Sequence, residues 1–352
     1  MNPLPRAKFV LLLLAACPIW AAQSGKSLSC VTCHRQQALY QAQTPMGIGM
    51  ELPPNLTVLK AHPKMTFEKG GYSYTVETTD GHATYTVTDG KDTVTLPIHY
   101  AFGAHIQTYV LEKDGHFFES LVSYYPAVGG LAITMGDERL QPHSLTEAMG
   151  RETDHQEITA CFGCHSSGAV KNGQLNLESL TPGLTCEHCH PGAQAHLDAL
   201  SHGQGGVLPK SLKSLSAEDT STFCGGCHRT WESVVRTRTW GELNVRFQPY
   251  RLANSKCFNG ADSRISCTAC HDPHRNLVRN DASYYDAKCL ACHGTAPVAS
   301  TAAVATMVAK HCPVSKNNCV SCHMPKIELP GSHAIFTDHQ IRIVHANEPY
   351  PN

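Results

Sequence analysis

The sequence predicts an α+β fold made of two unlike parts. Residues 64–145 carry short alternating segments separated by Asp-Gly turns, which is typical of an antiparallel β-meander or small barrel. Residues 146–352 hold six of seven copies of one short cysteine-histidine motif, and their pattern is mostly helical or irregular. At 352 residues the chain is long enough for two domains of ordinary size.

The composition argues against several classes of protein. Lys and Arg number 28 against 29 Asp and Glu, so no basic field is present to hold a phosphate backbone, and nucleic acid is not an expected partner. Hydrophobic residues make up 41%, a share that disordered and collagen-like chains do not reach. The 17 Cys and 22 His are the unusual counts, and they carry the functional prediction.

The amino terminus has the layout of a secretory signal peptide over residues 1–22. Arg6 and Lys8 precede a short apolar run, and small residues follow it. That run is too short to span a bilayer, and no later stretch approaches about 18 consecutive apolar residues, so no transmembrane span is expected. The run ends in a segment that also resembles a bacterial lipobox, with Cys17 as a lipid anchor. Both readings predict export, to the periplasm or the outer cell surface.

Fourteen cysteines fall into seven copies of Cys-x-x-Cys-His, numbered here as motifs 1 to 7 in chain order. Two thiols one helical turn apart reach the two vinyl groups on one porphyrin edge, and the next residue brings an imidazole to the iron. The predicted thioether cysteines are Cys30 and Cys33, Cys161 and Cys164, Cys186 and Cys189, Cys224 and Cys227, Cys267 and Cys270, Cys289 and Cys292, and Cys319 and Cys322. The predicted proximal iron ligands are His34, His165, His190, His228, His271, His293 and His323.

Zinc knuckles and a disulfide framework are the alternatives for paired cysteines, but neither requires a His after every second Cys. Seven covalently bound c-type haems are therefore predicted. An exported protein is consistent with this, because c-type haem is attached outside the cytoplasm. Of the remaining cysteines, Cys257 and Cys312 are predicted to form a disulfide, with a reactive thiol as the lesser alternative.

The motifs are unevenly spaced along the chain. Residues 23–63 hold the first haem segment, and residues 146–352 form a six-haem cytochrome c domain. The stretch from motif 2 to motif 7 leaves roughly 27 residues for each haem, which is too few for a core built from side chains. We therefore expect a haem-cored region whose macrocycles supply much of the buried apolar area and lie close together.

The intervening residues 64–145 read as an antiparallel β domain. Five strands are expected, and they are residues 72–78, 82–88, 93–96, 106–112 and 117–125. They predict a five- or six-stranded sheet or a small barrel. Tyr124 and Tyr125 are interpreted as packing residues of the sheet, because aromatic residues are common in strands.

Several motifs resemble those of a known superfamily. The segment from Gly183 to His190, followed by His196, resembles a signature of a superfamily of multihaem c-type cytochromes. This superfamily includes the tetrahaem cytochrome of nitrifying bacteria and the hydroxylamine oxidoreductases. The Gly that follows the haem-binding His in the signature is missing here. Motifs 5 and 7 are similar to motifs of the same group, and the chain looks like a heptahaem member. The resemblance covers residues 30–50 and 161–345. No motif ends in the Lys that marks the catalytic haem of pentahaem nitrite reductases.

Fifteen His outside the motifs exceed the seven sixth ligands that closed irons would need. The resemblance implies His274 and His196 first, and it places Met46 where many relatives have a distal His for motif 1. Met50, His62, a His of the sheet and an open iron remain alternatives at motif 1. The candidate distal ligands are Met46, His155, His196, His202, His274, His333 and His339.

Two functions stay open. The first is an electron-transfer cytochrome that moves electrons along its haems between redox partner proteins of the cell envelope. The second is an oxidoreductase with one five-coordinate haem acting on a small nitrogen or sulfur compound. Electron transfer is favoured, because nothing in the sequence marks a catalytic haem. An oligomer or filament is compatible with either.

Overall fold

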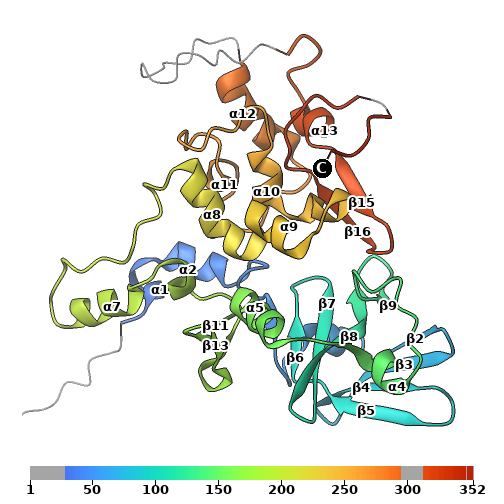
Figure 1. Cartoon of the computed structure of the whole chain (residues 1–352). Helices are drawn as coiled ribbons and strands as arrows, with labels where there is room; N and C mark the ends of the chain where they lie inside the picture. The colour runs from blue at the N-terminus through green and yellow to red at the C-terminus, as the bar shows by residue number, and fades with distance from the viewer. Residues whose placement is uncertain (1–27, 295–311, 346, 352) are drawn as a thin grey trace, which may run out of the picture.

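The structure is a computed structural model that describes residues 28–294, 312–345 and 347–351. The predicted signal peptide and Cys17 lie outside the described residues. A β-rich part and a part made of short helices lie next to each other (Figure 1). Within the described ranges, no helix combines the length and the apolar character needed to cross a membrane.

The first sheet has four antiparallel strands in chain order. They are β2 (Lys64–Lys69), β3 (Tyr72–Thr79), β4 (His82–Thr88) and β5 (Thr93–Pro97). The turn between β3 and β4 places Asp80 and Gly81 at φ 52° and 80°, the left-handed pair that a tight hairpin requires. The strands expected at 72–78, 82–88 and 93–96 are therefore confirmed to within one residue.

A second antiparallel sheet holds six strands. They are β1 (Met50–Glu51), β6 (Tyr100–Phe102), β7 (Gln107–Lys113), β8 (His116–Tyr125), β9 (Gly130–Ile133) and β10 (Gly150–Glu152). The expected single sheet is thus two sheets. The chain changes sheets after Pro97, which has no N–H to continue a ladder. Because β1 and β10 pair with β6 and β8, the sheet also extends beyond residues 64–145 on both sides.

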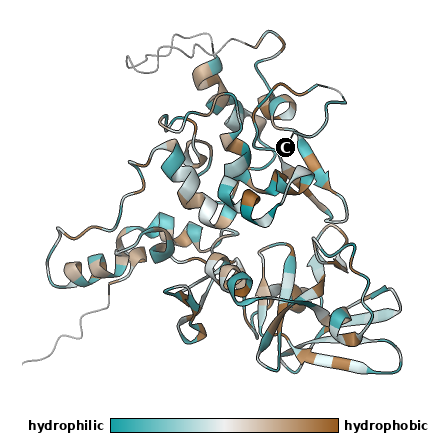
Figure 2. Ribbon diagram, in the orientation of Figure 1, coloured by the Kyte–Doolittle hydropathy of each residue, from teal (hydrophilic) through white to brown (hydrophobic). Residues whose placement is uncertain are grey.

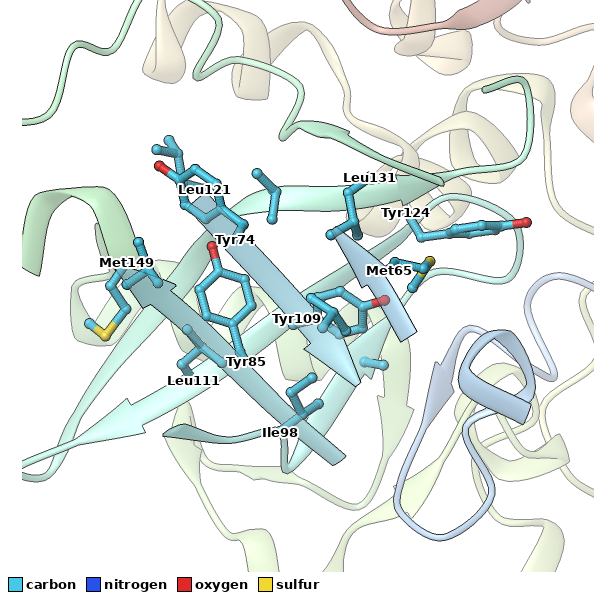
Figure 3. Close-up of a cluster of buried hydrophobic side chains, with 14 of the residues drawn as sticks. Met65, Tyr74, Tyr85, Ile98, Tyr109, Leu111, Leu121, Tyr124, Leu131 and Met149 are labelled. Atoms are coloured by element: carbon cyan, nitrogen blue, oxygen red, sulfur yellow. The ribbon is translucent and has the colours of Figure 1, made fainter. Parts of the chain in front are cut away.

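The core of the β-rich part lies between the two sheets (Figure 3). Tyr74 and Tyr85 of the first sheet pack with Tyr109, Leu111 and Leu121 of the second. Alternate strand residues point to opposite faces, so each sheet contributes every second side chain to this layer. The short helices α3 (Thr57–Ala61) and α4 (Leu145–Met149) add residues to the same cluster.

The two tyrosines at the end of β8 are packing residues, as predicted. Tyr124 belongs to the buried cluster between the sheets. Tyr125 is fully buried, and its hydroxyl donates a hydrogen bond to the carbonyl of Ile133 at 2.9 Å.

In the described ranges the helical part contains eleven short helices, seven of which hold motif residues. These are α1 (Cys30–Cys33), α2 (Arg35–Gln41), α5 (His155–His165), α6 (Cys186–Cys189), α7 (Ala193–Ser201), α8 (Ala217–His228), α9 (Trp231–Thr237), α10 (Gln248–Ala253), α11 (Cys267–Cys270), α12 (Ala282–His293) and α13 (Cys319–His323). This part also contains three pairs of short strands, which are β11 (Ser166–Ser167) with β14 (Thr181–Pro182), β12 (Val170–Lys171) with β13 (Gln174–Leu175), and the hairpin of β15 (Lys326–Leu329) and β16 (Ala334–Thr337). Two 3-10 turns are η1 (Leu177–Ser179) and η2 (Gly241–Arg246).

Apolar packing is much thinner among these helices than between the sheets. Around α9 and α10 the buried apolar cluster consists of Val234, Phe247 and Tyr250. Hydrophilic and hydrophobic residues are mixed along the helices in Figure 2. Side chains alone supply little core here, which is the situation expected of a region that folds around large apolar groups.

Candidate haem sites

Local helix signals place each motif. The N-cap residues of α5, α8 and α12 are Asp154, Ser216 and Asp281, whose side chains accept hydrogen bonds from the backbone N–H three residues later. Their last residues are the histidines of motifs 2, 4 and 6, so the two cysteines of each motif lie one turn apart. α1, α6, α11 and α13 hold the remaining four motifs as single turns.

His190 of motif 3 and His274 lie opposite each other. Their ring centroids are 6.1 Å apart, and the ring planes differ by 2°. Two metal–nitrogen bonds of about 2 Å and roughly 1.1 Å from each centroid to its nitrogen add up to about 6.2 Å. Nδ1 of His274 lies 3.3 Å from Oδ1 of Asp272, which leaves its Nε2 for a ligand. This pair therefore fits one six-coordinate iron.

His271 of motif 5 and His339 form a second pair. Their centroids are 6.2 Å apart, with 47° between the planes. Nδ1 of His339 donates to the carbonyl of Thr337 at 3.0 Å, so Nε2 keeps its lone pair. Burial lowers the pKa of His339 to about 4, which keeps the imidazole neutral and able to bind a metal at pH 7.

Two further proximal histidines have their Nδ1 atoms fixed. His165 donates to the carbonyl of Gly49 at 2.9 Å, and His323 donates to the carbonyl of Arg342 at 2.8 Å. A second-sphere acceptor of this kind sets the tautomer, so that Nε2 is the ligand atom. Sequence reasoning missed both acceptors, because a backbone carbonyl leaves no mark on residue type.

The other distal candidates lie in varied settings. Nδ1 of His196 lies 2.5 Å from the carbonyl of Val207, and Nδ1 of His202 lies 2.7 Å from that of Asp198. In both histidines these contacts involve Nδ1, so they leave Nε2 available as a ligand atom. His155 is the exposed first residue of α5. The ring of His333 packs edge-on against a sheet residue, Tyr125, at 5.5 Å.

The candidate sixth ligands of motif 1 lie in three different places in the fold. Met50 is buried in an apolar cluster with Phe102 and Phe162, and Nε2 of His62 lies 3.3 Å from the Tyr124 hydroxyl. Met46 is only partly buried. It lies in the turn next to the residues that precede motif 3, since its carbonyl accepts the N–H of Leu184 at 2.9 Å.

The cysteines of neighbouring motifs meet. Besides burial, a neighbouring thiol shifts the pKa of a motif cysteine in four pairs, which are Cys30 and Cys186, Cys164 and Cys227, Cys224 and Cys267, and Cys289 and Cys319. These interactions link motif 1 to 3, 2 to 4, 4 to 5 and 6 to 7. Electrostatic interactions of Cys189 with Cys224 and of Cys270 with Cys289 link motif 3 to 4 and motif 5 to 6. All seven motifs thus belong to one connected cluster.

The predicted disulfide between Cys257 and Cys312 is wrong for this structure, where both are free thiols. Cys257 interacts with Cys292 and Cys270 of motifs 6 and 5. The backbone N–H groups of Ser315 and Val314 instead lower the pKa of Cys312. Each thiol is held in a different local environment.

A buried ion pair supports the segment that carries His339. Arg251 donates to both carboxylate oxygens of Asp338 at 2.8 and 2.9 Å, and both side chains are fully buried. Arg342 donates to the same carboxylate at 2.6 Å. Since Asp338 precedes His339, and the Arg342 carbonyl accepts a hydrogen bond from His323, this ion pair lies next to candidate ligands of motifs 5 and 7. Sequence reasoning missed it, because no spacing links residues 251 and 338.

Residues 134–191 match the family model of cytochrome c554 and c-prime. The matched residues include motifs 2 and 3. No curated protein and no solved structure matches the chain. The match supports a c-type cytochrome, a class that carries covalently bound haem and transfers electrons.

Proposed function

We propose that this chain is an exported heptahaem c-type cytochrome that carries electrons along closely spaced haems. The observation that carries the proposal is the connected cluster of seven Cys-x-x-Cys-His motifs, because each motif's thiols interact with those of at least one other motif. When bound, c-type haem supplies one-electron exchange at its iron.

The contacts between motifs suggest an order for the path. Thiol interactions run from motif 1 to 3, then to 4, 5, 6 and 7, and motif 2 branches from 4. Motif 4 is therefore the branch point, because its thiols interact with those of three other motifs. The polypeptide's role along this path is to hold neighbouring sites at contact distance.

The paired imidazoles support a carrier rather than a catalyst at two sites. The centroid separations of His190 with His274 and of His271 with His339, 6.1 and 6.2 Å, match an iron held between two imidazoles. An iron with two protein ligands exchanges electrons without binding substrate. Motifs 3 and 5 are thus assigned to electron transfer.

Localisation and partners follow from the same proposal. Export rests on the signal-like residues 1–22 and agrees with the site of c-type haem attachment. The polypeptide has a formal charge of −1, and each haem adds about two propionates. Redox partners with basic docking surfaces would complement such an acidic holoprotein.

One observation favours the second candidate, an oxidoreductase acting on a small nitrogen or sulfur compound. A cavity of about 330 Å³ lies beside His228 of motif 4. A small molecule could reach an iron there if that iron had no sixth ligand.

Optical and EPR spectra of the oxidised holoprotein test the choice. Seven low-spin haems that do not respond to cyanide, nitrite or hydroxylamine are the expected result. A high-spin ferric signal that shifts on adding one of these compounds would replace the carrier by the oxidoreductase. A preparation without a haem stain on a denaturing gel would remove both.

A further inference from the structure

Arg246, at the end of η2, is a partly buried cation with few partners. Its Nε is buried and has no hydrogen-bond partner. One Nη atom donates to the sulfur of Met135 at 3.1 Å, and the guanidinium lies 5.4 Å from the Phe247 ring. A thioether is a weak acceptor and does not neutralise a positive charge.

A second guanidinium shares this environment. Arg229 follows directly after His228 and, with Arg246, lines the cavity of about 330 Å³ together with Cys227, Thr237 and Thr239. Its charge acts on Cys164 and His165 of motif 2 as well as on Arg246. The two arginines therefore lie where motifs 2 and 4 meet.

The local charge balance is positive. In the part of the chain that the structure describes, neither guanidinium forms an ion pair within 4.0 Å. Glu119 and Glu138 act on Arg246 only over longer distances. Two like charges beside a cavity are unfavourable unless an anion lies between them, and a guanidinium binds a carboxylate through two parallel hydrogen bonds.

We propose that Arg229 and Arg246 form a site for one oxyanion group at the junction of motifs 2 and 4. The ligand is a carboxylate or a similar planar oxyanion. It has two sources, a propionate of a haem bound at one of these motifs and a free anion entering from solvent. The inference rests on the proposed function, since it assigns these residues a role toward a bound haem.

Two variants and a matched control test the site. Arg246→Gln and Arg229→Gln each remove one positive charge, whereas Arg246→Lys keeps it. Arg236→Gln removes the same charge from an exposed position on α9, outside the cavity. Haem content is first measured by intact mass, so that only preparations with the wild-type number of haems are compared. A wild-type protein without haem would defeat the proposed function, whereas variants with the full haem content test the two arginines separately from it.

The readouts separate the two sources. If a propionate fills the site, Arg246→Gln lowers the midpoint potential of one haem by about 59 mV, a tenfold change for one electron, while formate has no effect. If a free anion fills it, formate at constant ionic strength gives a saturable spectral change in the wild type that the Gln variants lose. Arg246→Lys is expected to retain most of either effect. Gln variants that match Arg236→Gln in both measurements would overturn the proposal.

Discussion

The imidazoles of His190 and His274 face each other with 6.1 Å between centroids and 2° between planes. One belongs to motif 3 and the other to the loop after motif 5. In the proposed cytochrome, a segment that follows motif 5 would thus complete the site at motif 3, and His339 would complete the site at motif 5. Each distal residue can therefore be removed without touching the motif it serves.

Replacing His274 by Ala should open one iron. The haem count stays the same, because no thioether cysteine changes. We expect a new high-spin ferric EPR signal and binding of cyanide by one haem per chain. His82→Ala, at the exposed first residue of β4, is the control and should leave both measurements as in the wild type. A His274→Ala protein that stays fully low-spin would show that another residue is the sixth ligand.

Asp338→Asn breaks the buried pair with Arg251. Removing one partner leaves an unpaired buried charge, which costs about 3–5 kcal/mol. We expect a lower unfolding midpoint in denaturant, together with partial high-spin character from release of His339. Glu77→Gln breaks an exposed pair with Lys64 and should change much less. Equal losses in the two variants would mean that the Asp338 pair has no special structural role.

Gly183→Ala tests the contact between the first haem segment and motif 3. Gly183 has φ +73°, and a Cβ there would collide with the carbonyl of Gly47. Gly203 has the same φ with open space around it, so Gly203→Ala carries only the left-handed penalty of about 1–2 kcal/mol. We expect the Gly183 variant to lose more stability in a thermal melt. A melt identical to that of the Gly203 variant would contradict the close packing.

Stability should depend on pH through Asp137. Burial, then the nearby Glu119 charge, raises the pKa of Asp137 to about 6 from 3.8, and its Oδ2 has no partner. The folded state binds the Asp137 proton more tightly than the unfolded state does. The ionised carboxylate therefore lowers the free energy of unfolding, an effect that is absent below pH 3.8 and complete above about pH 6. Asp137→Asn should therefore stabilise the protein by roughly 3 kcal/mol at pH 7.5 and leave it unchanged near pH 3.5. Thermal melts at both values check this, and an equal shift at the two would contradict it.

Local patterns predicted local structure well. Asp80-Gly81 and Asp114-Gly115 adopt positive φ in turns between strands, as expected of hairpin sequences. The division into two sheets could not be predicted, because it depends on strands from outside the meander pairing with β6 and β8.

The ligand sphere was only partly predictable. Each predicted proximal His is given by its pentapeptide, and His274 and His339 are among the predicted distal candidates. Which proximal His each one faces depends on how distant segments pack. The same is true of the Gly49 carbonyl and of Arg246, whose position beside motif 4 comes from the fold of η2 rather than from any spacing in the sequence.

Intact-mass spectrometry of the protein purified from the periplasm of a host that attaches c-type haem is the most direct measurement. We expect the processed polypeptide plus about 4.3 kDa, the mass of seven haems joined through both cysteines of each motif. A processed chain with no added mass would contradict covalent haem attachment, and with it the electron-transfer function proposed for this protein.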